Sequence, residues 1–181
     1  ILNQEEFHNN KIIIIDDGSQ DKTYKKIKKY LSLPFIEYFQ IENSGVEVAA
    51  NYAINKEAIV KDVLEGTAAI AAGPTPPAFA WAYNNNLQPY PYNPEKAKAL
   101  LNEANLSDKK LTFYVTQGGS GMLDPVAMGT AIQADLEAVG FDVEIKTFEW
   151  NAFLGEVNPG LEGKADMAEM AWMTNDPDTL P

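Results

Sequence analysis

Two pairs of aspartates are the residues of this sequence whose spacing could support chemistry. Asp16 and Asp17 follow a run of isoleucines, and Asp176 and Asp178 are separated by one residue near the C-terminus. Two carboxylates at the second spacing can hold Mg²⁺ or Mn²⁺ against a diphosphate. A simpler interpretation is that Asp176 and Asp178 form turns and bind no metal. We therefore expect no metal site and no cofactor.

The basic side chains narrow the chemistry further. All 14 basic residues are lysines, so the chain lacks the bidentate fork with which arginine holds carboxylates and phosphates. The sequence has no cysteine, and its one histidine, His8, is interpreted as an ordinary surface residue. We therefore assign no catalytic residue.

The overall charge is strongly acidic. Acidic residues outnumber lysines by 26 to 14, which gives a formal net charge of −12. Binding to nucleic acid depends on cations clustered along the phosphates, so this composition argues against a nucleic-acid partner. The apolar runs are too short to span a bilayer, and we expect no membrane insertion.

A glycine-rich stretch, QGGSG at residues 117–121, follows a predicted strand and precedes a predicted helix. The backbone amides of such a loop can cradle a phosphate, but a nucleotide-binding loop would continue into Lys and then Ser or Thr, and this loop does not. A flexible connection between the strand and the helix is therefore the favoured interpretation.

Alternating helices and strands predict the scaffold that positions these residues. In the part of the chain after Gly45, asparagine and aspartate residues stand where helices should begin, and Asn55, Asn93 and Asp124 are the expected N-caps. The predicted helices are residues 48–54, 56–65, the segment after Asn93, the segment from Asp124 to Gly140, and residues 150–157 with Asn151 as the cap. The predicted strands are residues 111–116, 141–145 and 166–173.

The first 45 residues predict a β-α-β unit. The run KIIIIDD at residues 11–17 is apolar enough for a parallel strand buried on both faces. Asp21 is expected to cap a helix with solvated lysines, and residues 35–41 predict a second strand. These 45 residues are nearly balanced in charge, whereas the rest of the chain carries almost all of the net negative charge, which indicates a boundary near Gly45.

The pattern as a whole predicts the α/β class, with an open, mostly parallel sheet flanked by helices on both faces in a Rossmann-like three-layer arrangement. We expect one sheet to run through the entire chain as a single compact domain. In such sheets, ligands bind beyond the carboxyl ends of the strands. That edge would carry Asp16, Asp17, Asn43, residues 117–121, Trp150 and residues 175–178.

Several motifs after the boundary carry a family resemblance. They are NYAINKEAIVKDVLEG at residues 51–66, PYPYNPEKAKALLNEAN at residues 89–105, the stretch from Asp124 to Trp150, and ADMAEMAWMTNDPDTL near the C-terminus. Residues 46–181 thereby resemble the second lobe of family 5 of the extracellular solute-binding proteins, which serve oligopeptide and dipeptide ABC transporters. The resemblance implies a peptide or small-molecule ligand, a membrane ABC permease as partner, an extracytoplasmic location and no catalysis. Such proteins are much longer and close a second lobe over the ligand.

The same resemblance assigns ligand-binding residues. The tryptophan of the last strand is Trp172, and the place of the acid that meets the amino terminus of the ligand falls on Asn175, with Asp176 beside it. An ammonium held by Asn175 loses the charge-assisted part of the bond unless Asp176 reaches it. Gln117 and Gly118, at the expected binding edge, complete the predicted set. The alternative places Trp172 in the core and Asp176 in a turn.

A second resemblance covers about a quarter of the chain, at its N-terminus. The string DDGSQDKT at residues 16–23 and the turn ENSG at residues 42–45 are similar to motifs of the family 2 (GT-A) glycosyltransferases. That resemblance implies that Asp16 and Asp17 contact a nucleotide. The metal-binding D-x-D motif that should follow on a later strand is not found after Gly45.

The sequence therefore predicts two joined pieces: a glycosyltransferase-like β-α-β fragment at residues 1–45 and a solute-binding lobe at residues 46–181. The favoured function is peptide or small-solute binding by a truncated and chimeric lobe. A nucleotide-sugar glycosyltransferase fragment and an engineered chimeric scaffold without activity are the alternatives. The chain opens on Ile and lacks the pattern of a signal peptide, which indicates a mature product, an excised fragment or an engineered chain.

Overall fold

The computed structural model describes residues 12–16, 36–40, 44–73, 75–119, 121–161 and 163–171. The chain divides into two compact units, Ile1–Val48 and Ala49–Pro181, and each unit is considered by itself. The division lies close to the boundary predicted at residue 45, while the different ancestry of the two sides stays a prediction. Within the described stretches, none of the helices combines the length and the apolar character needed to cross a membrane.

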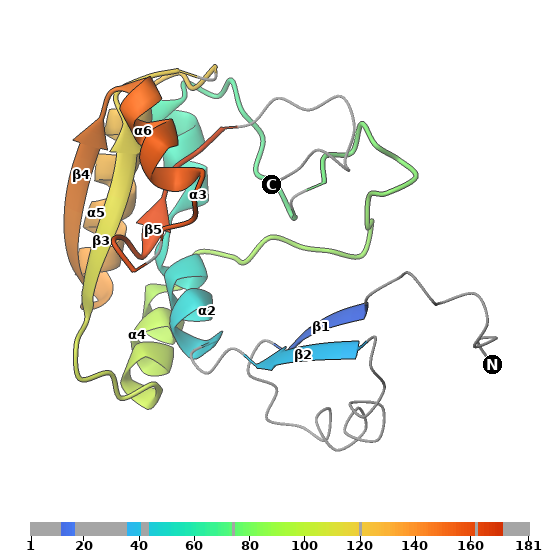
Figure 1. Ribbon diagram of the computed structural model, residues 1–181, viewed down its shortest axis with the longest axis vertical. Helices are drawn as coiled ribbons and strands as arrows, with labels where there is room; N and C mark the ends of the chain where they lie inside the picture. Colours follow the sequence, from blue (N-terminus) through green and yellow to red (C-terminus); the bar gives the residue numbers. More distant parts are fainter. Residues whose placement is uncertain are drawn as a thin grey trace. The chain divides into compact units, whose positions relative to one another are not determined.

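The first unit contains two strands, β1 (Ile12–Asp16) and β2 (Ile36–Gln40), which lie side by side in Figure 1. They are parallel, in a register that pairs Ile12 with Ile36. Parallel strands need a crossover connection of about a dozen residues or more, and residues 17–35 supply that length. Both predicted strands are confirmed along these spans. The helix predicted between them, and the burial predicted for the isoleucine side chains, lie outside the described residues.

The second unit contains a three-stranded parallel sheet. Its strands are β3 (Lys110–Thr116), β4 (Asp142–Phe148) and β5 (Met167–Ala168), in the order β4-β3-β5. The described strands thus form a two-stranded sheet in the first unit and a three-stranded sheet in the second. The single sheet expected through both units stays a prediction, because apolar periodicity specifies which face of a strand is buried, but not which distant strand it pairs with.

Helices cover both faces of this second sheet. They are α5 (Pro125–Val139) and α6 (Trp150–Val157), and Figure 1 shows α6 in front of β3 and α5 behind it. Val115 of β3 lies against Gly129 of α5, while Tyr114 packs with Phe153 of α6. Successive side chains of a strand point to opposite faces, so the two helices lie on opposite sides of β3. The predicted three-layer α/β class is confirmed.

The central strand β3 is buried on both faces as a result. Phe113, Tyr114, Val115 and Thr116 are each at most 5% exposed. β4 has one described neighbour, and its buried Val143 lies between exposed charged residues, as the sequence predicted for a strand with one wet face. The loop at residues 117–121 therefore follows directly on a buried stretch of β3.

Three predicted N-caps are confirmed by hydrogen bonds from backbone amides. Asn55, Asn93 and Asp124 each accept a bond of 3.0 Å, from the amides of Ala58, Lys96 and Ala127 respectively. The helices that they begin are α3 (Lys56–Ala58), which continues as the π-helix η3 (Ile59–Val63), α4 (Pro94–Glu103) and α5. Gly140 ends α5 with a φ of 110°, as predicted.

Three boundaries differ from the prediction. The helix expected at residues 48–54 is α2 (Ser44–Ala53), which begins earlier. The strand expected at residues 166–173 has only the two residues of β5 within the described part of the chain. The cap predicted at Asn151 is wrong, because the carboxylate of Glu149 accepts from the Asn151 amide at 3.0 Å and caps α6 instead.

Candidate functional site

The predicted ligand-binding residues Gln117 and Gly118 lie directly after the carboxyl end of β3. The amide of Gln117 donates to the carbonyl oxygen of Phe148 at 2.8 Å, which ties the end of β3 to the end of β4. The hydroxyl of Thr116 donates to the carbonyl oxygen of Gly118 at 2.6 Å and accepts from its amide at 3.3 Å. These bonds fix the turn at the edge of the sheet. They leave the Gln117 side chain exposed, with donors and an acceptor available to a ligand.

Trp150 packs directly on the glycine-rich loop. A Cβ atom on Gly119 would lie 2.5 Å from Cδ2 of Trp150, and the φ of Gly119 is 110°. The indole also stacks on Phe153, with ring centroids 5.9 Å apart. The close approach and the left-handed φ both require glycine. Gly119 therefore has a packing role that the sequence analysis did not predict.

The last described segment of the chain passes the same edge. The amide of Glu169 donates to the carbonyl oxygen of Tyr114 at 2.9 Å, immediately after β5. Parallel strands direct their carboxyl ends to one edge, so the chain leaves β5 beside the end of β3. Trp172, Asn175 and Asp176 follow in sequence and lie outside the described residues, so their assignment as ligand-binding residues stays a prediction.

The aspartates of the alternative nucleotide site belong to the first unit. The backbone of Asp16 ends β1 and pairs with Gln40 of β2. The side chain of Asp16, and the whole of Asp17 and Asn43, lie outside the described residues. Among the residues that are described, no group of three acidic or histidine side chains is placed to hold a metal ion.

Sequence reasoning missed Glu169, a buried carboxyl group behind the binding edge. Its residue surface is 7% exposed, and neither carboxyl oxygen has a hydrogen-bond partner within the described part of the chain. Burial raises the pKa of Glu169 from its ordinary value of 4.5 to about 7, and the negative charge of Asp124 adds to the effect. The available signal was one charged residue in the apolar run MAEMAW at residues 167–172.

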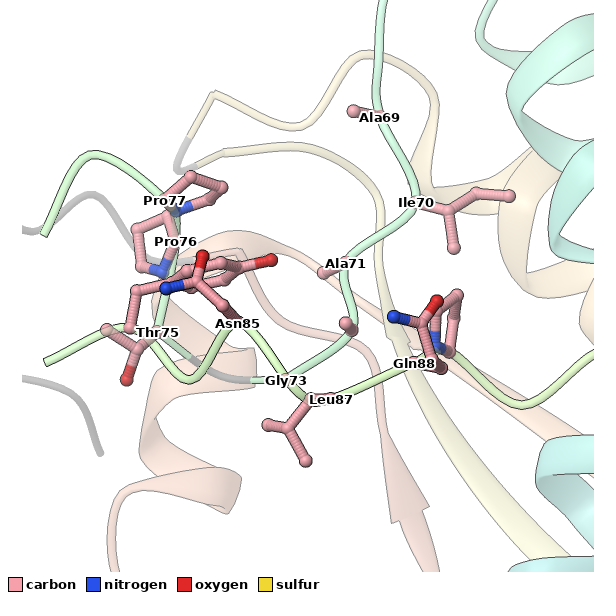
Figure 2. A pocket seen from close by; sticks show the side chains of 13 residues that line it. Ala69, Ile70, Ala71, Gly73, Thr75, Pro76, Pro77, Asn85, Leu87 and Gln88 are labelled. Carbon is pink, nitrogen blue, oxygen red and sulfur yellow. The ribbon is translucent and has the colours of Figure 1, made fainter. Parts of the chain in front are cut away.

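A cavity of about 590 Å³ lies in the irregular arm, defined here as residues 67–93 between η3 and α4 (Figure 2). Ile70 and Leu87 contribute apolar side chains, and Asn85 and Gln88 contribute amides. No charged residue belongs to the described lining. The volume is typical of pockets that hold small molecules. The lining does not include Gln117 or Gly118, so this cavity is distinct from the binding edge predicted from the sequence.

Family models match the chain in two places. Residues 30–181 match the middle part of the bacterial extracellular solute-binding proteins, family 5. Residues 1–56 match glycosyl transferase family 2. The first match includes the whole of the second unit, and the two matches overlap in residues 30–56.

Two known relatives are similar over most of this chain. The dipeptide-binding protein of Escherichia coli is 36% identical over 144 residues, which cover 77% of this chain and 26% of the relative. Heme-binding protein A of Haemophilus influenzae is 34% identical over 164 residues, which cover 82% of this chain and 30% of the relative. This chain therefore spans less than a third of the length of these relatives.

Solved structures show the same likeness. An ABC transporter-associated periplasmic binding protein of Helicobacter pylori, in complex with the peptide STSA, has 35% identity and a TM-score of 0.65 over 75% of this chain and 25% of that chain. A dipeptide-binding protein of Pseudoalteromonas, in complex with Met-Leu, has 26% identity and a TM-score of 0.63 over 81% of this chain and 27% of that chain.

Proposed function

The chain belongs to family 5 of the bacterial extracellular solute-binding proteins, and from this membership we propose that its second unit is part of a lobe that binds short peptides or similar small solutes. The proposed activity is binding and release without catalysis. The observation that carries the proposal is the shared carboxyl edge of β3, β4 and β5. There the side chain of Gln117 is exposed directly after β3, and β5 is followed in sequence by Trp172.

Peptides are the favoured ligand class. Relatives are named for dipeptides, for di- and tripeptides, and for glutathione, and two of the similar structures contain peptides. Recognition of a peptide main chain needs hydrogen-bonding groups placed along an edge, which gives affinity while tolerating different side chains. Heme-binding protein A shows that a relative of comparable identity carries the name of a different ligand, so similar small solutes remain within the proposal.

The proposed ligand contacts combine one described pair of residues with three that follow β5. Gln117 and Gly118 would offer polar groups to the ligand main chain, and Trp172 would cover it with an aromatic face. Asp176 would hold the ammonium group of the peptide by a charge-assisted hydrogen bond, because Asn175 carries no charge.

The description of one relative suggests a cellular location and a transport partner. The Helicobacter pylori protein is described as periplasmic and associated with an ABC transporter. By the same membership, we infer that the protein to which this chain corresponds works outside the cytoplasm and delivers its ligand to an ABC permease. Those properties are proposed by analogy with relatives of whose length this chain spans less than a third.

Titration calorimetry with mixed di- to pentapeptides tests the proposed function. A single wall of a cleft buries much less of a ligand than two walls do, so we expect a dissociation constant on the order of 1 mM, which corresponds to about 4 kcal/mol. The Trp172→Ala variant should lose this binding because the aromatic contact is removed. Trp81→Ala is the matched control, since Trp81 is 75% exposed in the arm, and it should bind as the unchanged chain does.

Two results would contradict the proposal. One is the absence of any heat at high peptide concentration. The other is equal heat from the unchanged chain and from Trp172→Ala, which would place the binding elsewhere.

A second candidate applies to the first unit alone. Residues 1–56 match a glycosyl transferase family, and β1 and β2 are parallel, as two strands of the predicted β-α-β fragment would be. We propose that residues 1–45 derive from such an enzyme, with Asp16 and Asp17 at its nucleotide-binding end, and that the chain is a chimera. Product formation from a sugar nucleotide in the presence of Mn²⁺ would establish activity. If this assay gives no product and the peptide titration gives no heat, a chimeric scaffold without activity is the remaining alternative.

A further inference from the structure

The last strand of the second sheet is held by few interactions. The ladder between β5 and β3 covers only two residue pairs. On either side of it, the amides of Asp166 and Glu169 donate to the carbonyl oxygens of Thr112 and Tyr114, both at 2.9 Å. The amide of Thr112 also donates to the Asp166 carboxylate at 2.8 Å. So short a strand depends on its side chains to stay on the sheet.

The side chain of Glu169, directly after β5, is buried in the second unit. It is enclosed against α5, where a Cβ atom on Gly129 would lie 3.2 Å from Oε2 of Glu169 and 2.8 Å from Cγ2 of Val115. Both carboxyl oxygens are buried without a hydrogen-bond partner in the described stretches. A buried carboxylate without a partner is much more costly than a buried neutral acid. The packed position therefore favours the protonated side chain.

The negative charge of a neighbouring residue raises the pKa of Glu169, as burial does. From α5, the carboxylate of Asp124 acts on it, and its like charge adds to the effect of burial. The charged residue of β3, Lys110, stands at the opposite end of the strand, and Asp166 on the β5 segment accepts the Thr112 amide. In the described part of the second unit, no ion pair includes Glu169.

We propose that Glu169 is a pH-sensitive positioning residue, whose neutral carboxyl group holds the end of β5 on the sheet and whose ionised form releases it. The chain runs from Glu169 directly to the proposed ligand-binding residues Trp172 and Asp176. Because Trp172 and Asp176 follow Glu169 in sequence, release of β5 is expected to weaken the proposed ligand binding as the pH rises. This link to the ligand rests on the proposed function, whereas the release of β5 does not.

The direction and size of the effect follow from the two protonation equilibria. In the released state, Glu169 is exposed and titrates near 4.5, while in the packed state its pKa is about 7. Between these values release is accompanied by loss of a proton, so the equilibrium constant for release rises about tenfold per pH unit. The attachment is strongest below about pH 4.5, and its loss levels off above about pH 7.

Amide hydrogen exchange, followed by NMR on the full chain from about pH 5 to pH 8, tests this proposal. After correction for the intrinsic exchange rate, the protection of the Glu169 amide should fall about tenfold per pH unit up to about pH 7. The Gln117 amide, which binds Phe148 across β3 and β4, should show no such fall. Glu169→Gln should make the profile flat. Glu144→Gln, at an exposed position of β4, should leave it unchanged.

A flat profile in the unchanged chain, or the same slope in Glu169→Gln, would overturn the proposal. A parallel fall at Gln117 would also overturn it, because the whole sheet would then be opening. If Glu169→Gln does not fold, Glu169→Met replaces it, since its apolar side chain of similar size needs no partner. That variant should give a flat profile and greater protection at about pH 7.

Peptide titrations at about pH 5.5 and pH 7.5 separate this proposal from the proposed function. Weaker binding at the higher pH in the unchanged chain, but not in Glu169→Gln, supports both the peptide-binding proposal and the role of Glu169. The expected exchange profile without peptide binding at either pH supports the role of Glu169 and rejects the peptide-binding proposal. Peptide binding with a flat exchange profile rejects the role of Glu169.

Discussion

At the scale of single residues, Gly119 controls how closely Trp150 approaches the turn after β3. Replacing Gly119 with Ala places a Cβ atom 2.5 Å from the indole and forces alanine into a φ of 110°. We expect the free energy of unfolding to fall by about 3 kcal/mol, from the combined backbone and overpacking costs. Chemical denaturation monitored by tryptophan fluorescence measures this loss.

Gly121 provides the matched control for that substitution. Its φ is 77°, but a Cβ atom there meets nothing within 4 Å. Gly121→Ala should therefore cost only the backbone term, about 1 kcal/mol. Equal losses in the two variants would show that Trp150 does not press on Gly119.

The buried carboxyl group of Glu169 should also appear in global stability. Its pKa is raised to about 7 in the folded chain, so this group stabilises the fold most below pH 4.5 and loses that contribution as the pH rises toward 7. The slope is at most about 1.4 kcal/mol per pH unit. Urea denaturation of the unchanged chain and of Glu169→Gln measures it as the difference between the two stability curves. A difference that does not change between pH 5 and pH 7 would contradict the raised pKa.

Two residues show where sequence reasoning stops at this scale. The side chain of Asn151 can cap a helix, but that of Glu149, two residues earlier, reaches the same amide and replaces it. The burial of Glu169 depends on the approach of Gly129 of α5 to its carboxyl group, which its neighbours in sequence do not indicate. The exposed Gln117 was located correctly after β3, because the end of a strongly patterned strand is a local property.

At the scale of secondary-structure elements, Asp124 begins the helix that covers one face of the sheet. Its carboxylate accepts the Ala127 amide at 3.0 Å. Asp124→Ala should lower the free energy of unfolding by about 1 kcal/mol, because an amide at the start of α5 loses its partner. Urea denaturation measures the change. Asp124→Asn keeps an acceptor and should restore most of the loss, and a failure to do so would assign the effect to charge instead of capping.

The elements were predictable where their signals are local. The Asn93 and Asp124 caps located the starts of α4 and α5, and Gly140 located the end of α5. The π-helix η3 was not predictable, since a single turn of i→i+5 hydrogen bonds over five residues is too short to give a periodic pattern of its own in the sequence. The short β5 was overestimated because its apolar run continues beyond the ladder with β3.

At the scale of the whole molecule, the sequence predicted the fold class better than it predicted which strands pair with one another. Alternating helices and parallel strands indicated the α/β class, and the structure confirms it in the second unit. The single sheet through both units stays a prediction, because strand partners are chosen by tertiary packing. The binding residues after β5 came from a family resemblance, and their roles remain part of the proposed function.

Binding of peptides at the shared carboxyl edge of β3, β4 and β5 should be visible in an NMR titration of the full chain. With a dipeptide added to millimolar concentration, we expect saturable shifts of the Gln117 and Gly118 amides and of the Trp172 indole N–H. The amides of β1 and β2 should stay unchanged. Saturable shifts confined to the arm cavity, or no shifts at all, would contradict the account.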